Sequence, residues 1–521
     1  MMGPASSTNS IVFPESGYHN VNDQNGQKLS RLILGLPATN ILGTMDRNIR
    51  EIVYDSRKSG PDCLFVAIPG GNCDGGAFIK DAVDKGASAF ITETSLDSLS
   101  GLDLGSRDIT ALCVEDARKA LSTVSANFYR RPSERLALTG ITGTNGKTTT
   151  AYILEALFGA QGTRTGVIGT INYHYGDKEL SAPVTTPESL DLNQMLDEMI
   201  KDKIINCFLE VSSHALQQRR VHDMRFKAGI FTNLSRDHLD FHGDMESYKN
   251  AKRKLFLDNH VQWKVFNVDD PVGRDFSREF KTDSFTTGIE NNADFKAENI
   301  TLTKAGSQFT LKTPFGTAEI QSNLLGQHNI HNLLSAAAGA MAQDISLKII
   351  QEVFRRIRPI PGRFESIDND QGFSVMVDYA HTDDALSKAI SAAKVFTEGK
   401  LIVVFGCGGD RDNGKRKAMG QAVINEADFS IITSDNPRTE DPEQIIEDIR
   451  QGVPSSAQEG IDYLAIINRK EAIHHAIHLA EKNDLVLIAG KGHEDYQVIG
   501  TQTIHFDDRE VARSALRQRS H

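Results

Sequence analysis

One short segment constrains this chain more than any other. The glycine-rich turn GTNGKTT at residues 143–149 lies between an apolar, β-branched run at 136–142 and a helical pattern at 148–158. Glycines let the backbone curl so that its N–H groups and the helix N-terminus point at a phosphate. Lys147 would bridge phosphate oxygens, and the Thr148 hydroxyl would bind magnesium. The segment therefore predicts a site for ATP and Mg²⁺.

The turn departs from the strict phosphate-loop pattern, because Ile141 occupies the place of its first glycine. A glycine-rich turn with an incidental lysine is the competing interpretation. The strand before the turn and the helix after it favour nucleotide binding. The residues expected at ATP are Gly143, Thr144, Asn145, Gly146, Lys147, Thr148 and Thr149.

The chain's 521 residues suit about three domains. Polar, proline-marked breaks at 129–133 and 358–363 divide it. The expected parts are a polar extension at 1–30, which does not read as a signal peptide, and domains at 31–131, 132–357 and 358–521.

Short β-branched runs alternate with helical patterns in all three segments, and 401–405, 429–433 and 485–488 read as buried strands. This pattern predicts an α/β protein with mainly parallel sheets: a phosphate-loop ATPase-type central domain, a Rossmann-like C-terminal domain and a smaller N-terminal domain. Ligands in such sheets bind beyond the carboxyl ends of the strands.

The composition excludes several classes of protein. A net charge of -12 argues against a nonspecific nucleic-acid binder, although a pocket can still be locally basic. Five scattered cysteines without a CxxC pair favour a reducing cytosol over a disulfide scaffold or a zinc site. No run of about 18 apolar residues is present, so no membrane span is expected.

Polar clusters follow two further expected strands. The strand at 204–209 leads into Glu210, and the strand at 228–232 leads into a segment that contains His238 and His242. A carboxylate at a strand end can reach a magnesium ion, but the histidines could equally be solvated loop residues. The stretch 247–256 carries four basic residues and could be a solvated basic face, so sequence alone singles out none of them.

Taken together, these segments resemble the Mur ligase family. The stretches that carry the resemblance are, in chain order, GTNGKTTT, EVSSHAL, TNLSRDHLDFHG, YKNAKRKLF, GQHNIHN, PGRFE, VDYAHTDDAL, CGGDRDNGKR, SDNPRTEDP and GKGHEDYQ. The resemblance implies a uridine-nucleotide domain, a central ATPase domain and a C-terminal domain that receives an amino acid.

The resemblance also implies roles for residues of the central domain. The catalytic residues would be Lys147, Glu210, His238 and Lys252. Thr148, Glu210 and His238 would surround magnesium, together with Lys252 as a carbamate (N6-carboxylysine) formed with carbon dioxide. Carbamylation would turn a repulsive cation into a metal-binding anion.

Further ATP contacts are implied at Asn329, Asn332, Arg363, Asp378 and His381. Asn329 could instead be a plain helix cap, and Arg363, at a domain junction, could form a linker salt bridge.

The implied contacts to the UDP-muramoyl-dipeptide lie in two domains. They are Tyr54, Ser56, Gly71, Asn72, Cys73, Thr185, Thr186, Ser212, Gln218 and Arg220. Two positions depart from the family pattern. Val184 stands where some relatives have asparagine, which puts one substrate contact in doubt, and Asp383 stands where proline is frequent, which should alter only a helix start.

The incoming amino acid would be read by Arg411, Asp435, Asn436, Pro437, Arg438, Gly490 and Glu494. A proline turn with a surface arginine is the competing interpretation of the stretch DNPR. Within the family an arginine there suits a substrate with a second carboxylate, because the guanidinium binds carboxylate bidentately. This favours meso-diaminopimelate over lysine.

The expected enzyme is an ATP-dependent amide ligase acting on UDP-N-acetylmuramoyl-L-alanyl-D-glutamate through an acyl phosphate, in peptidoglycan precursor synthesis. It is expected to be cytoplasmic and monomeric, without nucleic-acid or membrane partners. The sequence names no base for the amine. The alternatives are folylpolyglutamate synthase or a Mur ligase with another acceptor, a phosphate-loop NTPase that drives movement or switching, and a non-catalytic nucleotide-binding regulator.

Overall fold

A computed structural model describes residues 26–70, 74–102 and 108–519. It divides into two compact units, Met1–Ala120 and Leu121–His521, and each is described here by itself. Most of the expected polar extension, and the expected site residues Gly71, Asn72 and Cys73, lie outside the described residues.

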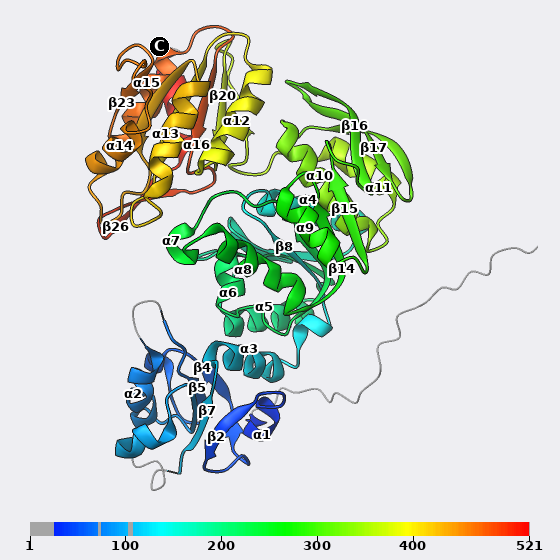
Figure 1. Ribbon diagram of the computed structural model, residues 1–521, viewed down its shortest axis with the longest axis vertical. Helices are drawn as coiled ribbons and strands as arrows, with labels where there is room; N and C mark the ends of the chain where they lie inside the picture. Colours follow the sequence, from blue (N-terminus) through cyan, green and yellow to red (C-terminus); the bar gives the residue numbers. More distant parts are fainter. Residues whose placement is uncertain (1–25, 71–73, 103–107, 520–521) are drawn as a thin grey trace, which may run out of the picture. The chain divides into compact units, whose positions relative to one another are not determined.

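The first unit contains a five-stranded sheet in the order β2-β7-β6-β5-β4 (Figure 1). Its strands are β2 Ala38–Leu42, β7 Thr110–Val114, β6 Ala89–Thr92, β5 Cys63–Val66 and β4 Glu51–Val53. Strands β4 to β7 pair in parallel, and β2 adds an antiparallel edge. The core side chains Phe65 and Phe90 pack with Ile79 of α2 (Ile79–Asp84). Tyr54 and Ser56 directly follow β4.

The second unit contains an eleven-stranded sheet in the order β11-β10-β9-β12-β8-β13-β14-β15-β16-β17-β18. In that order the strands are Lys178–Ser181, Asn172–Tyr175, Thr165–Ile168, Asn206–Glu210, Ala137–Thr142, Arg225–Phe231, His260–Asn267, Ser284–Gly288, Phe295–Thr303, Gly306–Thr313 and Gly316–Ser322. The seven strands from β9 to β16 pair in parallel, whereas β10, β11, β17 and β18 are antiparallel additions.

Helices cover both faces of this sheet, as Figure 1 shows around β8. Successive side chains of a strand point to opposite faces, so Leu138 and Ile141 of β8 enter different hydrophobic clusters. Ile141 packs with α4 (Lys147–Ala160) and α10 (Gln327–Met341), whereas Leu138 packs with α5 (Ser189–Lys201) and α8 (Met245–Leu257). Burial on both faces explains the nearly continuous apolar strands of the sequence.

A six-stranded sheet, β19-β20-β24-β21-β22-β23, forms the C-terminal part. Its strands, in that order, are Glu365–Ser366, Ser374–Asp378, Leu485–Ala489, Leu401–Cys407, Phe429–Ser434 and Tyr463–Ala465. Only the β19 pairing is antiparallel. Its helices are α12 Asp383–Phe396, α13 Gly414–Glu426, α14 Pro442–Arg450, α15 Arg469–Leu479 and α16 Asp508–Arg519.

A fully buried ion pair ties the last helix to this sheet. Arg469 at the start of α15 donates to both carboxylate oxygens of Asp508 at the start of α16, at 2.8 and 2.7 Å. Its remaining protons reach the carbonyl oxygens of Ser434 and Ala489, at 3.3 and 2.9 Å. The guanidinium thus fixes the carboxyl ends of β22 and β24.

The expected α/β architecture with mainly parallel sheets is confirmed. The three strands expected at the C-terminal end are β21, β22 and β24, each ending one or two residues later than expected. The antiparallel edge strands were not predicted. Asp383 is the first residue of α12, behind the cap Thr382. Within the described residues no helix is long and apolar enough to span a membrane.

Candidate active site

The glycine-rich turn joins β8 to α4 and is anchored to the segment that follows β13. Asn233 accepts from the N–H groups of Thr144 and Asn145, each at 2.9 Å. Gly146 has φ +86°, and a Cβ there would collide with the Asn332 side chain, so the turn requires glycine. The expected phosphate cradle is therefore fixed by the backbone itself.

Lys147 folds back over this turn. Its ammonium donates to the carbonyl oxygens of Gly143 and Thr144, at 3.0 and 2.9 Å. Burial lowers the pKa of Lys147, while the nearby Glu210 carboxylate raises it. The ammonium is thus held at the turn, close to where phosphate oxygens would lie.

Glu210 ends β12 and is fully buried. The backbone N–H and the hydroxyl of Thr170 both donate to its carboxylate, each at 2.9 Å. Thr148 is also buried, and its hydroxyl accepts from Arg363 at 3.0 Å. Two of the expected magnesium ligands are therefore rigidly placed oxygen donors.

His238 precedes α7 (Leu239–His242) with φ +55°. Burial lowers its pKa to about 3, so the ring is neutral at physiological pH and can offer a lone pair. Its side chain is 41% exposed, but it lines a cavity and packs against the His214 ring at 4.8 Å, so its surroundings differ from those of a loop histidine in open water. The other histidine of this segment, His242, forms a hydrogen bond with the Ser213 hydroxyl at 2.9 Å.

Lys252 is the basic residue of α8 that the structure singles out. It is 1% exposed, donates to the Gly143 carbonyl at 2.8 Å and lies 4.5 Å from the Tyr248 ring centroid. Burial and the neighbouring Lys147 hold its pKa well below the usual value. A buried amine with a lowered pKa is neutral more often, which carbamylation requires. The solvated-face interpretation holds for its three partly exposed neighbours Lys249, Arg253 and Lys254.

These donors fit a magnesium ion. The described residues contain no group of three or more His, Cys, Asp and Glu arranged around a common point. Magnesium nevertheless takes few protein ligands, usually one or two carboxylates, and completes its shell with water and substrate phosphates. A buried carboxylate and a threonine hydroxyl beside a phosphate cradle match that preference for oxygen ligands.

The residues expected to reach the nucleotide from elsewhere meet at the same turn. Asn329 and Asn332 are buried in α10 and joined by a 3.0 Å hydrogen bond. The helix has no side-chain cap, so the helix-cap interpretation of Asn329 is wrong. Arg363 contacts Thr148, and its guanidinium carbon lies 4.4 Å from the Tyr379 ring centroid. Its side chain forms these contacts and not a linker salt bridge.

Asp378 and His381 follow β20. Asp378 accepts from the backbone N–H groups of Phe364 and Ala380, at 2.7 and 2.8 Å, and burial raises its pKa. His381 Nδ1 donates to the Tyr379 carbonyl at 2.8 Å, which leaves Nε2 directed to other groups.

Four of the residues expected at the muramoyl-peptide, Thr186, Ser212, Gln218 and Arg220, form one hydrogen-bonded network beside Glu210. Arg220 donates to the Thr186 carbonyl at 2.7 Å and to Gln218 at 2.6 Å. Thr186 bonds Ser212 at 3.3 Å and also the Glu210 carbonyl at 2.7 Å. Val184, the first departure, is 43% exposed.

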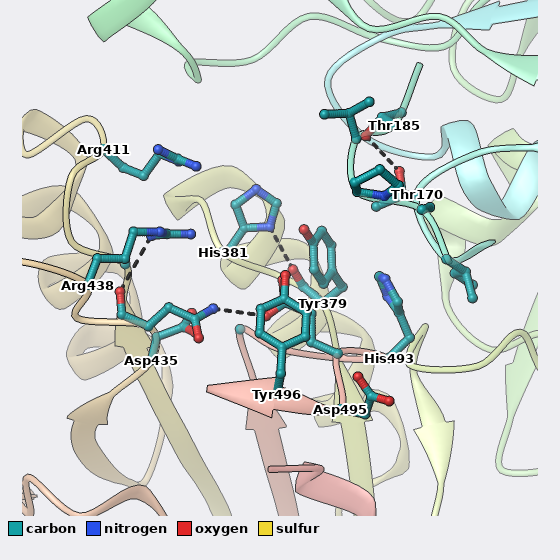
Figure 2. A pocket seen from close by; sticks show the side chains of 18 of the residues that line it. Thr170, Thr185, Tyr379, His381, Arg411, Asp435, Arg438, His493, Asp495 and Tyr496 are labelled. Carbon is teal, nitrogen blue, oxygen red and sulfur yellow. Dashed lines mark hydrogen bonds between the residues drawn. The ribbon is translucent and has the colours of Figure 1, made fainter. Parts of the chain in front are cut away.

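A cavity of about 1020 Å³ opens next to these groups (Figure 2). Nine of the expected site residues line it: Thr185, His238, His381, Arg411, Asp435, Asn436, Arg438, Gly490 and Glu494. Figure 2 shows Arg411 and Arg438 on the same side of the cavity, with Thr170 and Thr185 across from them. The cavity therefore lies between the ends of two different sheets.

Arg438 is held at the cavity wall by its own backbone. It has φ +54°, its N–H donates to the Val498 carbonyl at 3.1 Å, and its carbonyl accepts from Gly500 at 2.7 Å. Its guanidinium donates to the carbonyl oxygens of Gly409 and Asn436, at 2.7 and 3.4 Å, and the side chain lines the cavity. The surface-arginine interpretation is therefore wrong.

One charged cavity residue that was not predicted is Asp237. Asp237 is 5% exposed and lies 3.7 Å from the Lys415 ammonium and 3.8 Å from His381 Nε2. Burial raises the pKa of Asp237, but the hydrogen bond from His381 and the neighbouring His238 and Lys415 hold it well below its usual range. Its position in the polar cluster after β13 was the available signal.

Comparisons with known proteins agree with this geometry. Three family models match: "Mur ligase family, catalytic domain" at residues 48–129, "Mur ligase middle domain" at 141–340 and "Mur ligase, glutamate ligase domain" at 362–492. The UDP-N-acetylmuramoyl-L-alanyl-D-glutamate--2,6-diaminopimelate ligase of Geobacillus thermodenitrificans is 42% identical over 94% of this chain and 100% of its own. A Clostridium acetobutylicum protein with the same description, numbered 1, is 41% identical over 94% and 99%.

A solved structure with that description is 32% identical, covers 95% of this chain and 100% of its own, and has a TM-score of 0.67. The similarity runs through all three matched segments and through both the phosphate cradle and the cavity. The chain belongs to the Mur ligase family.

Proposed function

We propose that this protein is an ATP-dependent ligase that adds meso-diaminopimelate to UDP-N-acetylmuramoyl-L-alanyl-D-glutamate. The relatives at 41–42% identity carry this activity in their names. The observation that carries the proposal is the cavity, which runs from His238 and from Thr170, the hydrogen-bond partner of Glu210, to a wall bearing Arg411, Arg438 and Glu494. The reaction belongs to peptidoglycan precursor synthesis, and we propose a cytoplasmic monomer.

The segments 31–131, 132–357 and 358–521 would hold the uridine nucleotide, ATP and the amino acid respectively. Amide formation from a carboxylate requires an activated carbonyl. The γ-phosphoryl group of ATP would pass to the D-glutamyl γ-carboxylate to give an acyl phosphate, and the amine of diaminopimelate would then displace phosphate. In such reactions the protein mainly positions the groups and neutralises charge.

The residues around the turn divide this work. Lys147 and the turn N–H groups would hold the phosphates, while Asn332 and Arg363 would steady the nucleotide. Thr148, Glu210 and His238 would hold magnesium, which would neutralise charge on the transferring phosphoryl group. Arg220 and its hydrogen-bonded partners would orient the muramoyl-peptide so that its carboxylate faces the cradle.

Lys252 would carry a carbamate. Its burial and lowered pKa support this, because the neutral amine is the form that adds carbon dioxide. The carbamate would place a negative charge beside the turn where the amine now contacts Gly143.

Lys252→Ala should lower the rate of ligation by about 100-fold, because one anionic partner at the phosphates is lost. Added acetate should restore part of the rate, and intact-protein mass measured under native conditions should show the carbon dioxide adduct on the wild type only. Lys254→Ala serves as the control, because Lys254 lies on the same helix but is partly exposed. An acetate response as large in Lys254→Ala as in Lys252→Ala would contradict the carbamate.

The far end of diaminopimelate carries a carboxylate and an ammonium. Arg438 and Arg411 would take the carboxylate, and Asp435 and Glu494 the ammonium. Lysine ends in an ammonium alone, so it would leave the two arginines without a carboxylate partner, and their positive charges would repel its ammonium.

The proposal is tested by measuring phosphate release with the uridine dipeptide and a panel of amino acids. Release should require both substrates and should be fastest with meso-diaminopimelate. Release without an acceptor would indicate a switching or motor NTPase, no release at all would indicate a non-catalytic nucleotide binder, and preference for another acceptor would indicate a different ligase.

A further inference from the structure

A second lysine, Lys491, lies directly behind the amino-acid side of the cavity. It follows Gly490 at the end of β24 and is 0% exposed, so it cannot itself reach a ligand. Its ammonium donates to Asn436 Oδ1 at 3.2 Å and to Glu494 Oε2 at 3.0 Å. A buried ammonium is costly unless it is paired, so its partners show what it does.

The partners of Lys491 are the residues that line the cavity. Glu494 Oε2 accepts from both Lys491 and Asn436 Nδ2, each at 3.0 Å. Asn436 Oδ1 also accepts from the Val498 N–H at 3.0 Å. The side-chain amide and the carboxylate are therefore locked in one orientation, with Glu494 Oε1 left for a ligand.

The third partner is Asp435. Its Oδ1 lies 3.6 Å from the Lys491 ammonium and is buried without a hydrogen-bond donor within the described residues. Asp435 is 7% exposed and lines the cavity. A buried carboxylate oxygen that lacks a donor is costly, and an ammonium from the cavity would satisfy it.

The charge of this cluster follows from its members. Asp435 and Glu494 bring two negative charges, and Lys491 removes one, so the cluster presents one net negative charge. Two facing carboxylates without that cation would bind a proton or a further cation. One net charge matches one ammonium, which leaves the guanidinium of Arg438 available for a carboxylate.

We propose that Lys491 is a positioning residue that sets the charge of the amino-acid site to accept one ammonium together with a carboxylate. This inference rests on the proposed function and deepens it. Without Lys491 the site is more negative, so it favours an amino acid whose far end is an ammonium alone.

The test is Lys491→Met, which keeps the length of the side chain and removes the charge. The ratio of kcat/KM for meso-diaminopimelate to kcat/KM for L-lysine should fall by about 10- to 100-fold. KM for ATP should stay at the wild-type value, because the side-chain partners of Lys491 named above are residues assigned to the amino acid and none is assigned to ATP. Lys470→Met, an exposed lysine on α15, is the matched control and should leave the ratio unchanged.

Both amino acids are measured on one preparation, so the ratio is independent of the folded fraction. The double variant Lys491→Met/Glu494→Gln removes one charge of each sign and also serves if the single variant is insoluble. It should bring the ratio back toward the wild-type value. An unchanged ratio in Lys491→Met, or a further fall in the double variant, overturns the inference. Wild-type protein that makes no product with diaminopimelate would instead overturn the proposed function.

Discussion

Replacing Lys147 with methionine should lower phosphate release by on the order of 10³-fold. The ammonium is held by the carbonyl oxygens of Gly143 and Thr144, where the cradle would receive the phosphates. Methionine fills the same space without charge, so the fold should remain while the transferring phosphoryl group loses the lysine cation. The measurement is single-turnover formation of ADP with all three substrates present.

Two observations separate this effect from a packing defect. Lys264→Met, a partly exposed lysine on β14 of the same sheet, should keep the wild-type rate. Thermal unfolding of Lys147→Met should occur near the wild-type temperature. A residual rate within about tenfold of the wild-type rate would mean that groups other than Lys147 stabilise the transferring phosphoryl group.

Replacing Arg438 with alanine should remove about 100- to 1000-fold of the preference for meso-diaminopimelate over lysine. The positive φ of Arg438 and its two backbone hydrogen bonds fix the guanidinium at the cavity wall. A substrate carboxylate would therefore lose a pre-oriented partner. The measurement is kcat/KM for both amino acids.

The control for Arg438 is Arg450→Ala on α14, which pairs with Glu459 outside the cavity. It should leave the preference unchanged. If Arg438→Ala slows both amino acids equally, the arginine does not read the far carboxylate. If the wild type prefers lysine, the assignment of the acceptor fails as well.

The parts of this site that could be predicted from sequence depend on local backbone. The turn at 143–149 needs glycine at particular dihedral angles, and Glu210 ends an apolar strand, so both are visible in the chain itself. The parallel core could be predicted because strands buried on both faces are continuously apolar. The antiparallel strands at the two ends of the sheet could not, because β11 is exposed throughout and β18 has only two buried residues among seven, so neither has a continuous apolar run.

Other features depend on contacts between distant segments. Lys252 lies on the side of α8 that faces the turn, whereas Lys249 and Lys254 lie on other sides. A stretch with four basic residues in ten does not indicate which of them is on the buried side. Lys491 is harder still, since a lysine in a polar motif normally lies in water. Its burial follows from Asp435, Asn436 and Glu494 converging on it from two strand ends.

The buried ion pair between Arg469 and Asp508 limits where the C-terminal part of the protein can be truncated. The family model ends at residue 492, yet the carboxylate that neutralises Arg469 lies in α16, beyond that limit. A fragment ending at the model's boundary would keep an uncompensated guanidinium under the loops that carry Asp435 and Gly490. The smallest C-terminal fragment that keeps this ion pair therefore extends into α16, beyond the segment matched by the family model.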